Sequence, residues 1–319
     1  MALFLGIDGG GSKTSCLIGD ETSILGAGTA AGSNLIRVGQ AQAREALANA
    51  IRQACAIANV APSQIQRICV GLAGAAGPEV AERVREIVAE LLSDEGRPGE
   101  TSVGEIQVVG DMVIALQAAF DNGPGVIVIA GTGSIAYGRN AQGESMRAGG
   151  WGFAISDEGS GHWIGRAVVA AAMRAMDEAE GGSAKTVDVL MKSWRLQTIE
   201  QLVMAANSTP PPDFAALFPT VLSLADSGDR IALEVLTNAG AELAKLAGIV
   251  IQRLFPSSGA VSVAMSGGVF GSSPLVRQVF YNSLRSDRTD ATINPSVIEP
   301  VRGALELARQ GAVKIADRG

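Results

Sequence analysis

Short apolar runs separated by polar turns open the chain and predict three strands followed by helix–strand pairs. The runs Leu3–Ile7, Thr14–Ile18 and Ile24–Ala27 are β-compatible and are divided by glycine-rich turns. Apolar residues at helical spacing then predict a helix over Gln40–Ala58. The rest of this half is expected to contain a strand at Ile65–Leu72, a helix at Pro78–Leu92, a polar loop at Gly96–Gly104, a strand at Ile106–Val109 and a helix at Met112–Phe120.

The same order of elements restarts after residue 124. Strands are predicted at Gly125–Ala130, Ile135–Gly138, Ser145–Arg147 and Val261–Met265, and helices at Trp163–Met176, Pro274–Leu284 and Val301–Ala312. The segment "INPSVIEP" before the last helix loosely matches the strand "IQVVGD" of the first half. Each half therefore reads as βββαβαβα, an α/β pattern. We expect two domains, at residues 1–114 and 115–319, with a helical insertion at about 178–229. The last helix, about 298–313, is a candidate to pack back on the first domain.

Composition narrows the possible partners. The chain has 319 residues, a net charge of −7, a pI near 4.9 and only 4% aromatic residues, which argues against a nucleic-acid or anionic-membrane surface. The three cysteines lack C-x-x-C spacing, so neither a zinc site nor a disulfide framework is expected. The N-terminal stretch lacks the basic start of a signal peptide, and a cytoplasmic protein is expected.

Two glycine-rich loops stand at equivalent places in the two halves. The first, "GIDGGGSKT" at Gly6–Thr14, does not fit the Walker phosphate loop, and a strand follows it where a helix would be needed. It is predicted to be a hairpin whose residues Gly9–Ser12 bind β- and γ-phosphates through backbone N–H groups and the Ser12 hydroxyl. The second, Gly131–Ser134, would face the same polyphosphate. An ordinary glycine turn is the alternative for the first loop taken alone.

Carboxylates near these loops suggest phosphoryl transfer. Asp8 directly precedes the first loop, and a cation such as Mg²⁺, held through water, would relieve its repulsion from phosphates. Asp111 ends one predicted strand and begins a helix, which suits a base that accepts the proton of an acceptor hydroxyl. A plain helix N-cap is the alternative for Asp111. Lys13 either reaches a phosphate or is a solvated strand residue.

The segment Gly149–Gly165, "GGWGFAISDEGSGHWIG", combines glycines, two tryptophans, adjacent carboxylates and the only histidine of the chain. Apolar ring faces and carboxylates are what a sugar site uses. His162 is expected to pack at a helix start rather than to act in catalysis. A third glycine turn, Ser266–Gly268, would let an adenine or ribose approach the backbone.

As an ordered set, the motifs "DGGGSKT", "SN" (33–34), "GLAG" (71–74), "GD" (110–111), "GTGS", "GGWG…SDEGS" and "SGGV" resemble a known family. They are similar to the N-acetylglucosamine kinase-like sugar kinases of the BadF/BadG/BcrA/BcrD-type ATPase family, within the sugar kinase/actin/heat-shock ATPase superfamily. The resemblance covers nearly the whole chain. It implies duplicated ribonuclease H-like, actin-like ATPase domains with a cleft between them, and it implies ATP and a hexosamine as the substrates.

The resemblance also implies roles for particular residues. Asp111 would be the catalytic base for the sugar 6-hydroxyl, and Asp8 would hold Mg²⁺ through water. The sugar would be lined by Asn34, Asp111, Ser134, Gly150, Trp151, Gly152 and Asp157. ATP would be bound by Gly10, Gly11, Ser12, Lys13, Thr14, Thr132, Gly133, Ala215, Gly267, Gly268 and Gly271. Ile135 stands where animal N-acetylglucosamine kinases have asparagine, which keeps glucosamine and other hexoses open.

Three functions follow as hypotheses. The first is an ATP-dependent kinase for an amino sugar, with N-acetylglucosamine favoured and glucosamine or a broader hexose range as alternatives. The second is an ATPase activator of a redox enzyme, which would need cysteines aligned for an iron–sulfur cluster. The third is a non-catalytic sugar sensor. A homodimer is what the family suggests, with no nucleic-acid or membrane partner.

Overall fold

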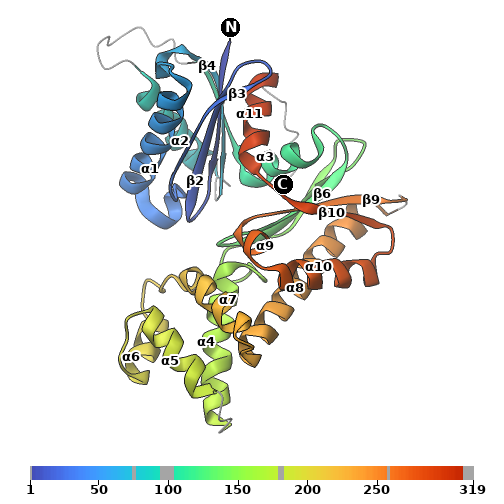
Figure 1. Ribbon diagram of the computed structural model, residues 1–319. Helices are drawn as coiled ribbons and strands as arrows, with labels where there is room; N and C mark the ends of the chain where they lie inside the picture. The colour runs from blue at the N-terminus through green and yellow to red at the C-terminus, as the bar shows by residue number, and fades with distance from the viewer. Residues whose placement is uncertain (1, 74–76, 94–103, 179–182, 257–258, 312–319) are drawn as a thin grey trace. The chain divides into compact units, whose positions relative to one another are not determined.

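The first sheet of the computed structural model has five strands in the order β3-β2-β1-β4-β5 (Figure 1). The structure describes residues 2–73, 77–93, 104–178, 183–256 and 259–311. The strands of this sheet are β1 (Leu3–Gly9), β2 (Lys13–Gly19), β3 (Ile24–Ala31), β4 (Ile65–Leu72) and β5 (Glu105–Gly110). The β1–β2 and β2–β3 pairs are antiparallel, whereas β1–β4 and β4–β5 are parallel. The carboxyl ends of β1, β4 and β5 therefore meet at one edge.

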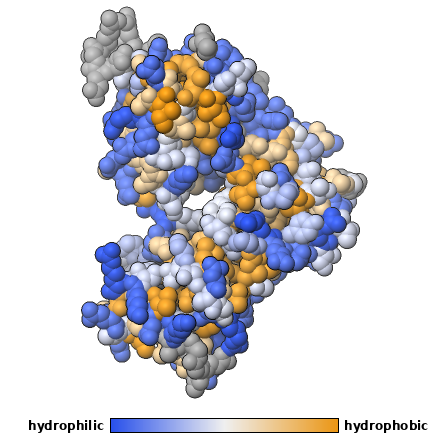
Figure 2. Space-filling model, in the orientation of Figure 1, coloured by the Kyte–Doolittle hydropathy of each residue, from blue (hydrophilic) through white to orange (hydrophobic). Residues whose placement is uncertain are grey.

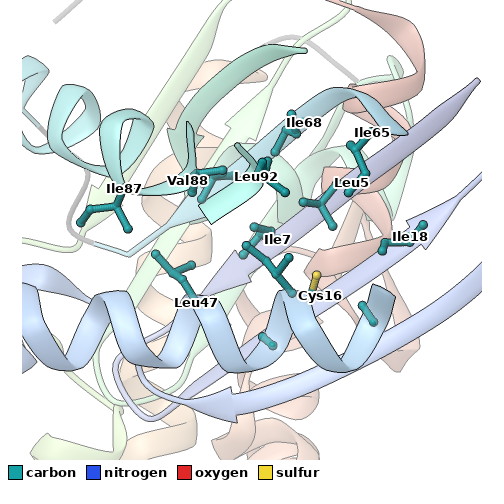
Figure 3. Packing of buried hydrophobic residues seen from close by; sticks show 14 of the residues in the cluster. Leu5, Ile7, Cys16, Ile18, Leu47, Ile65, Ile68, Ile87, Val88 and Leu92 are labelled. Carbon is teal, nitrogen blue, oxygen red and sulfur yellow. The ribbon is translucent and has the colours of Figure 1, made fainter. Parts of the chain in front are cut away.

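Successive side chains of a strand point to opposite faces of the sheet, and β1 carries apolar side chains on both. Helices therefore cover both faces. On one face, Leu5 and Ile7 of β1 pack with Leu47, Val88 and other residues of α1 (Leu35–Ala58) and α2 (Pro78–Leu92), as Figure 3 shows. On the other face, Phe4 packs against α3 (Asp111–Phe120) and α11 (Pro300–Gln310). A short 3-10 helix, η1 (Pro62–Gln64), precedes β4.

Helix α1 begins at Leu35, five residues before the start predicted from periodicity. The Asn34 side chain caps it by accepting hydrogen bonds from the backbone N–H groups of Ile36 and Arg37. The apolar periodicity was broken at Gly39, whose φ of 77° and ψ of 166° are non-helical. The predicted start at Gln40 was therefore wrong because it marked the second part of a kinked helix.

The second sheet also has five strands, in the order β10-β9-β6-β7-β8. Its strands are β6 (Gly125–Ala130), β7 (Ser134–Arg139), β8 (Ser145–Gly149), β9 (Val261–Ser266) and β10 (Ala291–Ile298). The helices of this half are α4 (Gly161–Asp177), α5 (Ser183–Ser193), α6 (Ile199–Ala206), η2 (Phe214–Leu217, 3-10), α7 (Phe218–Asp226), α8 (Arg230–Leu254), α9 (Gly268–Ser272) and α10 (Pro274–Asp287). The duplicated βββαβαβα order is confirmed, with extra helices between α4 and α8.

The chain forms two compact units. Unit 1 comprises residues 1–127, 137–146 and 296–319, and unit 2 comprises 128–136 and 147–295. Helix α11 belongs to unit 1, where it packs on β1 and α3. The domain boundary at residue 114 stays a prediction. Helix α11 ends at Gln310, before the predicted end near 313, because Gly311 has a φ of 82°, which is not helical.

Figure 2 shows hydrophobic patches between hydrophilic ones on the face in view, which is ordinary for a protein surface. Among the described helices, none has an apolar stretch long enough to cross a membrane. The predicted loop at 96–104 and the Gly74 position of the "GLAG" motif fall outside the described residues, apart from Gly104.

Candidate functional site

The first glycine loop is a hairpin between β1 and β2, as predicted. The Gly10 N–H donates to the Lys13 carbonyl at 2.9 Å, which closes the turn. The Ser33 N–H donates to the Gly10 carbonyl at 3.1 Å, so the segment before α1 anchors the loop. Ser12 and Lys13 are exposed at its tip. Backbone and side chains of this tip are thus presented to solvent, as a phosphate-binding loop requires.

Thr14 has a different surrounding from these exposed residues. Its side chain is fully buried, and its hydroxyl donates to the Ala31 carbonyl at 2.7 Å and lies 2.8 Å from Ser33 Oγ. The Thr14 hydroxyl thus connects β2 to the end of β3 and to the segment after it. Sequence reasoning missed Ser33 as the other half of this connection, although the "SN" motif contained it.

Two carboxylates lie close together at the carboxyl edge of the first sheet. Asp8 pairs with Gly71 of β4, and Gly71 pairs with Val109 of β5, two residues before Asp111. Burial first, and then the charge of the neighbouring Asp111 carboxylate, raise the pKa of Asp8 from 3.8 to about 7, while Lys13 partly opposes the shift. Asp8, Asp111 and Lys13 therefore form one interacting group of charges beside the loop.

Asp111 is the first residue of α3, while Gly110 occupies the N-cap position. Its Oδ1 accepts from the Met112 N–H at 2.9 Å, and the helix N-terminus favours a negative charge there. Helix α3 can approach the sheet closely because β4 carries glycine at residue 71. A Cβ at Gly71 would lie 2.2 Å from Ile114 Cδ1. Gly71 thus helps to place Asp111 next to Asp8.

The second glycine loop, between β6 and β7, is held by the start of α4. The Gly131 N–H donates to the Gly133 carbonyl at 2.9 Å. The Gly161 N–H donates to the Gly131 carbonyl at 2.8 Å, and the His162 N–H donates to the Thr132 carbonyl at 3.2 Å. The predicted hairpin is therefore present, and α4 fixes its position within unit 2.

Asp157 joins this second loop to the glycine segment that follows β8. Its backbone is left-handed, with a φ of 68°, and its carboxylate accepts from the N–H groups of Ser134 and Gly152. Burial raises the pKa of Asp157, the Glu158 charge acts in the same direction, and the two backbone bonds oppose the shift. A Cβ at Gly133 would lie 2.8 Å from Asp157 Oδ2, so the loop needs glycine there.

Ser134 is also engaged inside unit 2. Its hydroxyl is buried and donates to the Glu158 carbonyl at 2.7 Å. Like Asp157, it therefore holds the loop and the 149–158 segment together, and its predicted contact with a sugar stays a prediction.

The segment after β8 exposes large apolar side chains on a glycine framework. Gly149, Gly150 and Gly152 have φ values of 73°, 70° and 94°. Between and after them, Trp151 is 64% exposed and Phe153 is 50% exposed. Such a surface would suit the apolar C–H faces of a sugar, and the sugar site expected at this segment stays a prediction.

His162 lies between Phe153 and Phe214, with ring centroids 4.9 and 5.2 Å away. It is the second residue of α4, which agrees with its expected packing at a helix start. The adjacent Ala215 lies beside α4, since a Cβ at Gly161 would be 3.5 Å from Ala215 Cβ. Ala215 is thereby close to the second loop.

The third glycine turn follows β9. Gly267 has a φ of 100°, and a Cβ there would lie 2.3 Å from the Ala130 carbonyl, directly before the second loop. Gly268 and Gly271 belong to the short helix α9, and a Cβ on either would meet no described atom within 4 Å. There is therefore open space above α9, and both glycines stay candidates for a nucleotide contact.

The carboxylates of unit 1 fit a magnesium site whose remaining ligands are water and substrate. Among the described residues, no three or more His, Cys, Asp or Glu side chains are grouped so that they could hold a metal ion. Asp8 and Asp111 nevertheless offer oxygen ligands side by side. Mg²⁺ is commonly held by one or two carboxylates together with water and substrate phosphates, and these two residues fit that kind of site.

Comparison with solved structures shows the fold. A structure from Chromobacterium violaceum, provisionally named an N-acetylglucosamine kinase, matches with a TM-score of 0.71 and 25% identity, covering 96% of this chain and 98% of that one. A ROK family glucokinase from Streptomyces griseus, solved with glucose and AMPPNP, matches with a TM-score of 0.60 and 18% identity, covering 97% of this chain and 100% of that one. The two-domain sugar-kinase fold expected from the sequence is confirmed.

Curated relatives match over nearly the full length. An N-acetylmuramic acid/N-acetylglucosamine kinase of Clostridium acetobutylicum is 29% identical over 97% of this chain and 99% of its own. An N-acetyl-D-glucosamine kinase of Dictyostelium discoideum is 28% identical over 96% of this chain and 97% of its own. A family model matches residues 5–308, and the chain belongs to the BadF/BadG/BcrA/BcrD ATPase family.

Proposed function

We propose that this chain is an ATP-dependent kinase that phosphorylates the 6-hydroxyl of an amino sugar, with N-acetylglucosamine as the favoured substrate. The observation that carries the proposal is the pair of carboxylates, Asp8 and Asp111, beside an exposed glycine loop. Curated relatives named as N-acetylglucosamine and glucosamine kinases support the same reaction. Glucosamine or a wider range of hexoses is the alternative substrate.

In this proposal the two carboxylates have separate tasks. Asp111 accepts the proton of the sugar hydroxyl as that oxygen attacks the γ-phosphorus of ATP, and ADP leaves. Asp8 holds the water shell of Mg²⁺, which supplies charge neutralisation to the phosphates when it is bound. Without a cation, Asp8 loses its proton only near pH 7, so it is a group whose charge depends on what binds beside it.

The glycine loops stabilise the charge of the transferred group. Backbone N–H groups of Gly9–Ser12 and of Thr132–Gly133 donate to phosphate oxygens, and Lys13 adds a positive charge beside Asp8. Asn34, Gly150, Trp151, Gly152 and Asp157 bind the sugar. Ala215 and the glycines of the β9–α9 turn contact the nucleotide. We also propose, from the family resemblance, a cytoplasmic homodimer.

The cysteines do not favour the redox-activator alternative. Cys16, Cys55 and Cys69 are all buried, and burial raises the pKa of each thiol, to about 12 for Cys69. Iron–sulfur clusters are bound by thiolates, and such burial opposes thiolate formation.

A coupled assay of ADP release tests the proposal. The panel is N-acetylglucosamine, glucosamine, N-acetylmannosamine, glucose and N-acetylmuramic acid. ATP turnover that no sugar increases would overturn it. Asp111→Asn is expected to lower kcat by about 100-fold or more, because general-base catalysis contributes 10²–10⁴-fold. ATP binding, measured separately by calorimetry, should change little, and activity that survives the substitution would reduce Asp111 to a helix-start residue.

A further inference from the structure

One buried carboxylate of unit 2 contacts two segments that the proposed function gives to different ligands. The second glycine loop, residues 131–134, is assigned to phosphate, and residues 150–152 are assigned to the sugar. The Asp157 carboxylate accepts hydrogen bonds from the N–H groups of Ser134, at the end of the loop, and of Gly152. Asp157 is only 8% exposed. A single side chain therefore joins the two segments.

The loop lies directly against this carboxylate. A Cβ at Gly133 would lie 2.8 Å from Asp157 Oδ2 and 3.4 Å from Oδ1, so both oxygens face the backbone of the loop. A second contact runs in parallel, because the Ser134 hydroxyl donates to the carbonyl of Glu158, the residue after Asp157, at 2.7 Å. A shift of residues 133–134 would therefore displace residues 157–158.

The sugar-assigned segment depends on the same carboxylate. Gly152 has a φ of 94°, and its carbonyl accepts from the N–H groups of Ile155 and Ser156 at 3.2 and 2.9 Å. Its N–H donates to Asp157, so Asp157 holds the other end of this peptide framework. A ligand that orders one of two connected segments lowers the entropy cost of ordering the other. The two segments are thus arranged to bind their ligands cooperatively.

We propose that Asp157 is a positioning residue that couples the two ligands, so that a nucleotide phosphate at residues 131–134 and a sugar at residues 150–152 strengthen each other's binding. This inference rests on the proposed function of the same segments. It adds a task to a residue that the proposed function counts among the sugar ligands. The two tasks are compatible, because a carboxylate has about four lone-pair sites and the two backbone bonds leave the others for a hydroxyl.

The experiment measures a thermodynamic cycle by calorimetry. The Kd of N-acetylglucosamine is determined with and without saturating AMPPNP and magnesium, and the Kd of AMPPNP with and without the sugar. The ratio of the two Kd values of one ligand is the coupling factor, and linkage requires the same factor for both ligands. AMPPNP is used because the sugar must not be phosphorylated during the measurement.

The variant is Asp157→Asn. Asparagine keeps the shape of the side chain and tolerates the left-handed backbone of residue 157, whose φ is 68°, but its amide has one acceptor oxygen where aspartate has two. Asp229→Asn is the matched control. Asp229 is another carboxylate of unit 2, and it accepts from the Ala232 N–H and the Thr186 hydroxyl, outside both segments. Circular dichroism checks that each variant is folded.

The coupling factor of the wild type is expected to lie at about 5 to 150, the range typical of coupled sites, and to fall about 5-fold or more in Asp157→Asn. Asp229→Asn should lower the melting temperature and leave the factor unchanged. A residue that only binds the sugar gives a different result, because its replacement weakens the sugar equally with and without AMPPNP.

Hydrogen exchange followed by mass spectrometry adds a measurement that needs no sugar. In the wild type, AMPPNP with magnesium should slow exchange in residues 149–158 as well as in the loop. In Asp157→Asn, the slowing should remain in the loop and be lost from residues 149–158. The wild-type result alone is decisive if the variant does not fold.

Two results would overturn the inference: an equal coupling factor in the wild type and Asp157→Asn, or bound AMPPNP that leaves exchange in residues 149–158 of the wild type unchanged. Turnover of the sugar would leave the kinase proposal intact in either case. Conversely, Asp157-dependent slowing of exchange in a protein that binds none of the sugars supports the inference and contradicts the kinase proposal.

Discussion

Replacing Asp8 by asparagine should stabilise the nucleotide-free protein. The folded state raises the pKa of Asp8 from its ordinary 3.8 to about 7, chiefly through burial and then through Asp111. Each unit of such a shift corresponds to about 1.4 kcal/mol, so the ionised Asp8 costs about 4 kcal/mol above pH 7. Asparagine has no charge to bury, but its amide retains some cost. We expect the free energy of unfolding to rise by about 2–4 kcal/mol at pH 8.

The pH dependence gives the sharper measurement. Between pH 3.8 and about 7, the folded state keeps a proton on Asp8 that the unfolded chain has released, so the stability of the wild type falls as the pH rises through this window. The Asn variant lacks this contribution. Its advantage over the wild type should therefore grow by about 2–3 kcal/mol between pH 5 and pH 8.

Urea unfolding without nucleotide or magnesium, at pH 5, 6, 7 and 8, measures this difference. All three tryptophans lie in unit 2, so tryptophan fluorescence follows that unit, while far-UV circular dichroism also reports on unit 1. Asp20→Asn is the matched control. Its pKa is lowered, first by hydrogen bonds from the N–H groups of Thr22 and Ser23, so this variant should lose stability and do so more at neutral than at acidic pH.

The reasoning would be refuted if Asp8→Asn were less stable than the wild type at pH 8, or if the two proteins had the same pH dependence. The same variant should fail to turn over sugar if the proposed function holds. Gain of stability together with loss of activity would mark Asp8 as a residue kept for function at the expense of folding.

Two further outcomes are expected. Gly165→Ala should destabilise unit 2 by about 2–4 kcal/mol, because the new Cβ would lie 1.9 Å from the Phe214 carbonyl oxygen and α4 would have to move away from η2. Tryptophan fluorescence during urea unfolding measures this loss of stability. An unchanged unfolding midpoint would contradict the prediction. The three buried cysteines should react with a thiol reagent far more slowly in the native protein than in urea, since burial raises the pKa of each thiol; rapid labelling of the folded chain at pH 8 would contradict the described burial.

The order of apolar, polar and glycine residues was sufficient to predict those elements that depend mainly on neighbouring residues in the sequence. Alternating apolar residues separated by glycines predicted both hairpins, and the polar end of an apolar run predicted that Asp111 begins a helix. The early start of α1 could not be read from periodicity, because Gly39 interrupts the helix while Asn34 supplies its cap.

The partners of polar side chains were less predictable. Thr14 and Ser134 were both chosen for a ligand, yet both hydroxyls are buried and bonded to backbone carbonyls far along the chain. The motif spacing does not distinguish a hydroxyl that binds a ligand from one that holds the loop. The stacking of Arg147 on Trp151 depends on the left-handed glycines between them, whose conformation is set only in the folded chain.

The place of α11 has a consequence for how the protein is made. Phe4 near the start of the chain is covered by Leu305 and its neighbours, and Arg309 donates to the carbonyls of Asp20 and Ser23. A ribosome that has completed β1–β5 has therefore produced a sheet with one apolar face still open. Helix α3 then covers part of that face, and the rest stays open until α11 is made, after the residues of unit 2. During this interval we expect the uncovered apolar residues to attract chaperones, and a chain that ends before residue 300 should keep them exposed.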